Sequence, residues 1–254
     1  MRNNLRTDLA AELVKATVSS SDDICTVSVL RLDAEQAKRY RKAPGKYTTI
    51  ETRAVSDGIQ SAYGRLSGAV ARTLTSYCAR PETVLVAGLG NEGMTADALG
   101  ALTADGVNVS GSRLRTVKAG VMGATGVESF DVIKGVTDRI QPSLVIVVDS
   151  LAAASVERVC NVVQFSDGGI TPGSGVSNHR KTLSKETLGV PVISVGVPLV
   201  VYASTIINEM CGGRCENNES DYVRSLIVTP KDIDILVRDC AKIISDGINA
   251  AYGT

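Results

Sequence analysis

The sequence is poor in aromatic side chains: it contains no tryptophan, two phenylalanines and seven tyrosines. So few rings cannot build the stacking surface on which many proteins bind single-stranded nucleic acid. Histidine is scarcer still, because His179 is the only one. One histidine cannot supply both ligands of an H-E-x-x-H zinc motif, and no G-x-S-x-G motif presents a nucleophilic serine. Serine, cysteine and zinc hydrolases of the common kinds are therefore not expected.

The chain also lacks an excess of charge of either sign and any long apolar run. Its 27 basic residues equal its 27 acidic residues, so no basic excess indicates nucleic acid as a partner. No apolar run is long enough to cross a bilayer, and the first residues, MRNNLRTDLAAE, lack the apolar core of a signal peptide. We therefore expect a cytoplasmic protein that binds neither nucleic acid nor a membrane.

Strand-like and helix-like segments alternate along most of the chain. Apolar residues recur at helical spacing over 59–77 and from Thr229 onward. The run SLVIVVD has apolar residues on both faces, as a buried parallel strand requires. This alternation predicts one α/β domain with a mostly parallel twisted sheet and helices on both faces. The expected strands are 24–32, 47–53, 83–88, 143–149, 161–167 and 191–198, and the other expected helices are 95–102, 127–140 and 150–159.

A glycine-rich loop follows the expected strand 83–88. Its sequence, GLGNEG, fits the G-x-G-x-x-G fingerprint of dinucleotide-binding loops over Gly88–Gly93. That fold also uses a carboxylate about 20 residues further on to hold the ribose, and the stretch SGSRLRTV at that distance contains no acid. Arg113 or Arg115 could instead hold a 2′-phosphate. Glu92 and Asp97, however, would repel a pyrophosphate from the start of the next helix.

Two aspartates follow expected strands. Asp97 lies just beyond the strand 83–88, and Asp149 is the last residue of the strand 143–149. Chemistry in open parallel sheets gathers outside the carboxyl ends of strands, and neighbouring strands lie only about 4.8 Å apart. When two carboxylates share a small site, one pKa rises, which provides a base and an acid at the same pH. Such a pair can hydrolyse a peptide bond by activating water and protonating the carbonyl oxygen.

Blander interpretations of these aspartates stay open at this point. Asp149 could simply cap the helix expected over 150–159. Asp97 could be an ordinary acid in the first turn of a helix, where the helix dipole favours it. Two acids could also hold a divalent metal.

Several long stretches resemble the germination proteases of spore-forming bacteria. They include LRTDLAAE, VAGLGNEGMTADALG, AGVMGATGVESFDVIKGV, VVDSLAAASVERV and QFSDGGITPGSGVSNHRKTLSKETLGVPVISVGVP, and they extend from residue 5 to 251. The resemblance implies an endopeptidase of the aspartic type, with a sheet similar to that of hydrogenase maturation proteases. It places the catalytic pair on Asp97 and Asp149. It also implies small acid-soluble spore proteins as substrates and a homotetramer. The related maturation proteases engage a metal through two acids and a histidine, and only the acids are clearly matched here, so we expect no required metal or cofactor.

The same resemblance gives a meaning to the N-terminal segment. Family members are made as zymogens that cut themselves near RTDLA, and their substrates are cut after an acidic residue. We therefore expect autocleavage between Asp8 and Leu9, with 1–8 as a short propeptide-like segment and 9–254 as the protease domain. The alternative is that LRTDLAAELVKA is simply the capped start of a helix.

A substrate with an acid at the cleaved bond needs a cationic pocket. The stretch SNHRKTLSK offers Arg180, Lys181 and Lys185 for substrate binding, although a solvated basic turn would look the same. In the stretch VPLVVYAS, this chain has Tyr202 at a position where germination proteases carry an aspartate. Two rival functions stay open: a metal-assisted maturation protease of the hydrogenase type, and a nucleotide-binding module that uses Gly88–Gly93.

Overall fold

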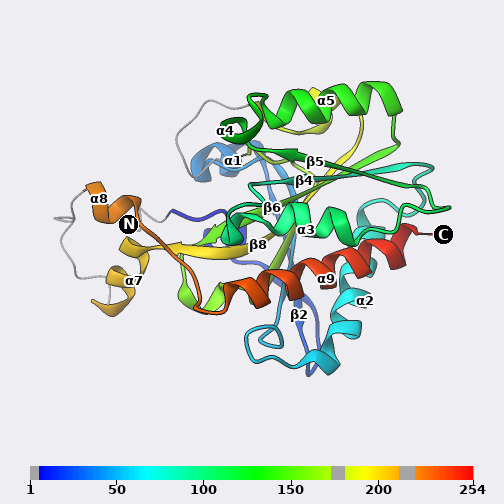
Figure 1. Ribbon diagram of the computed structural model, residues 1–254. Coiled ribbons are helices and arrows are strands. Elements are labelled where there is room, and N and C mark those ends of the chain that lie inside the picture. The colour runs from blue at the N-terminus through cyan, green and yellow to red at the C-terminus, as the bar shows by residue number, and fades with distance from the viewer. Residues whose placement is uncertain (1–5, 173–180, 212–220, 254) are drawn as a thin grey trace.

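The structure of this protein is a computed structural model, which describes residues 6–172, 181–211 and 221–253. In these residues one sheet of nine strands has the order β1-β2-β3-β7-β8-β6-β4-β5, and β9 pairs with β8 (Figure 1). The strands are β1 (Thr17–Ser21), β2 (Thr26–Leu32), β3 (Gly45–Glu51), β4 (Val84–Leu89), β5 (Leu114–Gly120), β6 (Leu144–Ala153), β7 (Val162–Ser166), β8 (Val192–Tyr202) and β9 (Ile227–Val228).

Helices cover both faces of the sheet, as predicted. In Figure 1, α5 lies on one side of the sheet, and α2, α3 and α9 lie on the other. The α-helices are α1 (Ala34–Tyr40), α2 (Tyr63–Tyr77), α3 (Leu99–Gly106), α4 (Met122–Thr125), α5 (Ser129–Ile140), α6 (Lys185–Leu188), α7 (Ala203–Met210), α8 (Asp221–Ser225) and α9 (Ile233–Tyr252). Short 3₁₀ helices are η1 (Ala10–Glu12), η2 (Gln60–Ala62), η3 (Thr95–Asp97) and η4 (Val156–Arg158).

The central strands are buried on both faces, which explains their continuous apolar sequences. In β4, Val84 and Val86 pack into the core under α2 and α9, while Leu85 and Ala87 pack into a second core that includes Ile133 of α5. A strand covered on both faces needs an apolar residue at every position. The α/β class predicted from these runs is therefore confirmed.

The sheet is parallel in one half only. β5, β4, β6 and β8 run parallel to one another, whereas β8, β7, β3, β2 and β1 are joined by antiparallel pairings. The short connection through α1 explains why β3 pairs antiparallel with β2. A seven-residue helix spans roughly 10 Å, but a seven-residue strand spans roughly 23 Å. The connection is therefore too short to carry the chain back to the start of β2, which a parallel pairing would require. β3 instead pairs antiparallel with β2.

Strand β6 is longer than the sequence indicated, and the helix predicted over 150–159 is wrong. β6 continues past Asp149 to Ala153, because Ser150–Ala153 keep pairing with β8 as far as Val201. Only the short helix η4 follows. Strands β1 and β5 were not predicted, and α9 begins at Ile233 rather than Thr229.

The buried stripe predicted for the last helix is confirmed. Ile233, Val237, Cys240, Ile244 and Ile248 of α9 all lie in the core. Gly247 brings α9 close to α2, because a Cβ atom there would lie 2.4 Å from Val70 Cγ1. Within the described ranges, no helix is both long and apolar enough to span a bilayer.

Two glycine-to-alanine changes test this packing. Gly247→Ala should lower the free energy of unfolding by roughly 1–3 kcal/mol, because the added methyl group overpacks the contact with Val70. Gly135→Ala is the matched control, since Gly135 lies within α5 and a Cβ there would meet nothing within 4 Å. This control should raise the stability by about 0.5–1 kcal/mol through helix propensity. Urea unfolding measures both, and equal effects of the two changes would contradict the packing.

Candidate active site

The glycines at the end of β4 and just after it allow the chain to fold tightly against the end of the sheet. A Cβ atom on Gly88 would lie 2.3 Å from the carbonyl oxygen of Gly100, at the start of α3. Gly90 has a φ of +91°, which favours glycine, and a Cβ there would lie 2.0 Å from the Asp97 carbonyl oxygen. The loop therefore packs backbone against backbone, and this contact fixes Asp97 over the end of β4.

Asp97 is the last residue of η3 and is partly buried. Its Oδ2 atom accepts a hydrogen bond from the backbone N–H of Asn91 at 2.8 Å. The carboxylate thus bonds back to the glycine loop from which the chain left β4. Asp97 does not sit in the first turn of a regular α-helix, since α3 begins only at Leu99.

Asp149 lies within β6, directly beyond the end of its pairing with β4. The last paired residues are Gly88 of β4 and Val148 of β6, and Asp149 then pairs with Gly196 of β8. Asp149 is only 8% exposed, and its Oδ1 atom accepts a hydrogen bond from the Ser150 N–H at 3.0 Å. A position inside a strand rules out the helix-cap interpretation of Asp149.

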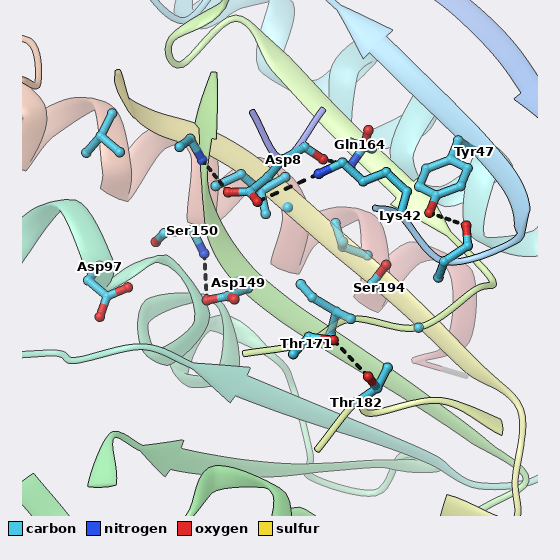
Figure 2. Close-up of a pocket in the computed structure, with 18 of the residues that line it drawn as sticks. Asp8, Lys42, Tyr47, Asp97, Asp149, Ser150, Gln164, Thr171, Thr182 and Ser194 are labelled. Carbon is cyan, nitrogen blue, oxygen red and sulfur yellow. Dashed lines mark hydrogen bonds and ion pairs between the residues drawn. The ribbon is translucent and has the colours of Figure 1, made fainter. Parts of the chain in front are cut away.

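The two aspartates line the same cavity, which has a volume of about 600 Å³. In Figure 2 the carboxylates of Asp97 and Asp149 lie toward the left of the view, and Asp8 and Lys42, which line the same cavity, lie above and to the right. β4 and β6 are adjacent parallel strands, so the two aspartates reach this cavity from neighbouring strands. Ser150, Gln164 and Tyr202 also line the cavity.

The N-terminal segment enters this cavity and is held along β6. The Asp8 N–H donates to the carbonyl oxygen of Ala152 at 2.8 Å, and the Ala152 N–H donates to Asp8 Oδ2 at 2.9 Å. Leu9, the next residue, is completely buried. The bond predicted for autocleavage, between Asp8 and Leu9, therefore belongs to a bound segment at the same site.

The side chain of Gln164, on β7, contacts this segment on both sides of Leu9. Its Nε2 atom donates to the Asp8 carbonyl oxygen at 3.1 Å, and its Oε1 atom accepts from the Ala10 N–H at 2.7 Å. These two hydrogen bonds and the two to Ala152 fix the backbone of 8–10 in one register. The segment is not a plain helix start, because only the single 3₁₀ turn η1 follows Leu9.

Lys42 supplies positive charge beside Asp8. Its Nζ atom lies 3.9 Å from Asp8 Oδ1 and donates a hydrogen bond to the Thr7 carbonyl oxygen at 2.7 Å. Burial lowers the pKa of Lys42, and the carboxylates of Asp8 and Glu12 partly oppose that effect. Burial in turn raises the pKa of Glu12, against hydrogen bonds from Thr7 and Ala154.

Comparison with known proteins assigns the chain to a family. Residues 3–212 match the sequence profile described as germination protease. The germination protease of Caldanaerobacter subterraneus subsp. tengcongensis is 34% identical, over 97% of this chain and 94% of the relative. That of Clostridium perfringens is 33% identical, over 98% of this chain and 95% of the relative. This chain belongs to the germination protease family.

Membership makes the protein a protease of spore germination. Among solved structures, the [NiFe] hydrogenase maturation protease HycI from Thermococcus kodakarensis is similar, with a TM-score of 0.44 and 18% identity. The match covers 70% of this chain and 99% of that one.

The basic residues expected to bind substrate in this germination protease lie elsewhere or outside the described residues. Lys181 Nζ is 3.9 Å from Asp131 Oδ1 and 5.0 Å from the centre of the Phe130 ring, on α5. Lys185 begins α6 and is exposed. Neither residue lines the cavity. Arg180, like His179, lies outside the described residues.

Sequence reasoning missed Lys42 and Gln164. Lys42 lies in the charged stretch DAEQAKRYRKAPGK, where no pattern distinguishes one basic residue from the others. Gln164 lies in a run that reads as a buried strand. A polar residue inside such a run was the one available signal, because a buried amide needs partners. In the part of the chain that the structure describes, no group of three His, Cys, Asp or Glu residues is arranged to hold a metal ion.

The glycine turn can be tested without touching a carboxylate. Gly90→Ala should destabilise the protein and reduce its protease activity, because the methyl group would collide with the Asp97 backbone at a φ that alanine rarely adopts. Gly93→Ala is the control, since its nearest neighbour would be the Asn91 side-chain oxygen at 3.3 Å. Denaturant unfolding compares the stability of the two variants, and a protease assay with casein compares their activity. Full activity in the Gly90→Ala protein would contradict the role of the turn.

Proposed function

We propose that this protein is an endopeptidase that starts the degradation of small acid-soluble spore proteins during germination, and that Asp97 and Asp149 are its catalytic pair. The observation that supports the pair most strongly is their common cavity, which also contains a bound segment of the chain. Family membership supports the substrate class. The setting would be the cytoplasm of the developing spore.

The chemistry needs one of the two carboxyl groups protonated. The ionised carboxylate takes a proton from a water molecule, whose oxygen attacks the peptide carbonyl carbon. The protonated carboxyl donates its proton to the carbonyl oxygen, which gives a neutral tetrahedral intermediate. Collapse of this intermediate returns a proton to the leaving nitrogen, and the C–N bond breaks. Two acids suffice for this sequence, so no histidine is required.

The N-terminal segment supports self-cleavage between Asp8 and Leu9. It lies in the same cavity as the two aspartates and is held by hydrogen bonds that an extended substrate could also make. In this proposal, 1–8 is the segment released from the zymogen and 9–254 is the protease. Small spore proteins would then bind along β6 as extended chains.

Assembly as a homotetramer is part of the proposal. Large apolar side chains on α7, α8 and β9 are exposed, including Met210, Tyr222 and Ile227. Such clusters often mark contacts between subunits, and light scattering measures the mass directly.

The nucleotide-binding alternative receives less support from the loop geometry. The Asn91 N–H, in the middle of Gly88–Gly93, already donates to the Asp97 carboxylate. A phosphate-binding loop needs such amide groups for its ligand. A protease assay with an added chelator distinguishes the metal-assisted alternative from the proposed mechanism. Activity should be unchanged if the two acids act without a metal.

Substitution of either aspartate tests the catalytic pair. Asp97→Asn and Asp149→Asn should each lower kcat on a spore-protein peptide by about 10²–10⁴-fold, because an amide cannot exchange the proton. Asp246→Asn is a matched control, since Asp246 pairs with Lys242 and does not line the cavity. It should leave kcat unchanged. Wild-type turnover in either the Asp97→Asn or the Asp149→Asn protein would remove that residue from the mechanism.

Self-cleavage has its own measurement. Purified full-length chain, incubated under maturing conditions, should lose eight residues and gain Leu9 as its N-terminus, as read by intact-mass and N-terminal peptide mass spectrometry. The Asp149→Asn chain should keep its full length, because cleavage needs the catalytic pair. A new N-terminus at any other residue would reject the site between Asp8 and Leu9.

A further inference from the structure

We propose that Lys42 is the specificity-determining residue of this site. Its ammonium group pairs with the acidic side chain that precedes the cleaved bond, in Asp8 of this chain and in the equivalent residue of a substrate. This inference rests on the proposed function and deepens it by naming the residue that selects acidic substrates. It differs from the expectation for Lys181 and Lys185, neither of which lines the cavity, while Arg180 lies outside the described residues.

The backbone of Lys42 is held in place independently of Asp8. At the end of α1, Arg41 adopts the left-handed conformation with φ 54°, and the Lys42 N–H donates to the Ala37 carbonyl oxygen at 3.0 Å. This is the usual way in which a helix ends in a fixed turn. The turn therefore holds the Lys42 backbone at the edge of the cavity whether or not the N-terminal segment is bound.

The position of the Lys42 side chain suits recognition of charge. Of the described residues that line the cavity, Arg41 and Lys42 are the cationic ones, and Arg41 is exposed. The Lys42 side chain is 15% exposed and the Asp8 side chain 22%. An ammonium group so far from water is costly without a nearby carboxylate. A neutral side chain in the place of Asp8 would remove the larger part of that compensation and leave only the smaller part, from Glu12.

The backbone contacts put the acidic side chain in a defined register with the bond to be cleaved. Gln164 donates to the carbonyl oxygen of Asp8, which is the carbonyl of that bond, and accepts from the N–H of Ala10. Ala152 binds one carboxylate oxygen of Asp8, and Lys42 lies beside the other. Main-chain contacts thus hold any extended peptide, while Lys42 and Ala152 read the side chain at one position.

The test uses two peptides and the full-length chain, before and after its self-cleavage. One peptide copies residues 6–12, and the other carries Asn in the place of Asp8. Wild type should cleave the acidic peptide with a kcat/KM about 10- to 100-fold higher. In Lys42→Gln this ratio should fall to about 1, and Lys42→Arg should restore much of it, because the charge returns.

Lys46→Gln is the matched control for the loss of a lysine. Lys46 lies four residues further on, contacts the Tyr77 ring and Ser76, and does not line the cavity. Its substitution should leave the ratio unchanged. If Lys42 only stabilised the fold, Lys42→Gln would lower the melting temperature and slow both peptides equally, with the ratio preserved.

Each outcome decides the inference. An active Lys42→Gln protein with an undiminished ratio, or a wild type without preference, overturns the role of Lys42 and leaves the proposed function standing. A wild type that cleaves neither peptide nor a small acid-soluble spore protein overturns both. If Lys42→Gln is inactive, wild-type protein is used to remove its first eight residues, and calorimetry on the cleaved chain decides: equal binding of the two peptides supports the role, and retained preference for the acidic peptide overturns it.

Discussion

A backbone contact without side chains holds this site together. Where β4 ends, Gly88 faces the carbonyl oxygen of Gly100, and Gly100 in turn lies against Leu89 and against the carbonyl oxygen of Val148 in β6. A Cβ atom added to Gly88 would lie 2.3 Å from the nearest backbone atom, and one added to Gly100 would lie 2.4 Å from its nearest backbone atoms. Both distances are shorter than non-bonded atoms can approach. Because this contact draws the start of α3 onto both strands, Asp97 comes to lie beside the point where Asp149 leaves the pairing of β4 with β6.

The same geometry explains how a glycine pattern typical of dinucleotide binding serves another purpose. In a nucleotide site, the glycines make room for a pyrophosphate. Here that room is filled by the backbone of 97–100, and a loop amide is satisfied by the Asp97 carboxylate. The glycine pattern indicates only that a ligand or another part of the backbone approaches the end of a strand closely. The acids beside the glycines favour the protein's own backbone over a phosphate.

The positions of the two aspartates could be predicted from the sequence because they depend on local signals: Asp97 follows an apolar run and a glycine turn, and Asp149 is the first acid after an unbroken apolar run. The length of β6 could not, since Ser150–Ala153 are strand residues only through their pairing with β8. The antiparallel half of the sheet and the contact between Asp8 and Lys42 depend on segments that meet only after folding. The sequence could not distinguish basic residues that bind substrate from those that pair elsewhere, such as Lys181, which lies beside Asp131 of α5.

The proposed mechanism depends most on Asp97 and Asp149 acting as one unit on a single water molecule. The double variant Asp97→Asn with Asp149→Asn tests this most directly when its kcat is compared with those of the two single variants. If the pair acts as a unit, the double variant will be no slower than the slower single variant, because the first substitution already removes the shared function. Losses that multiply in the double variant would show two independent contributions and contradict the mechanism.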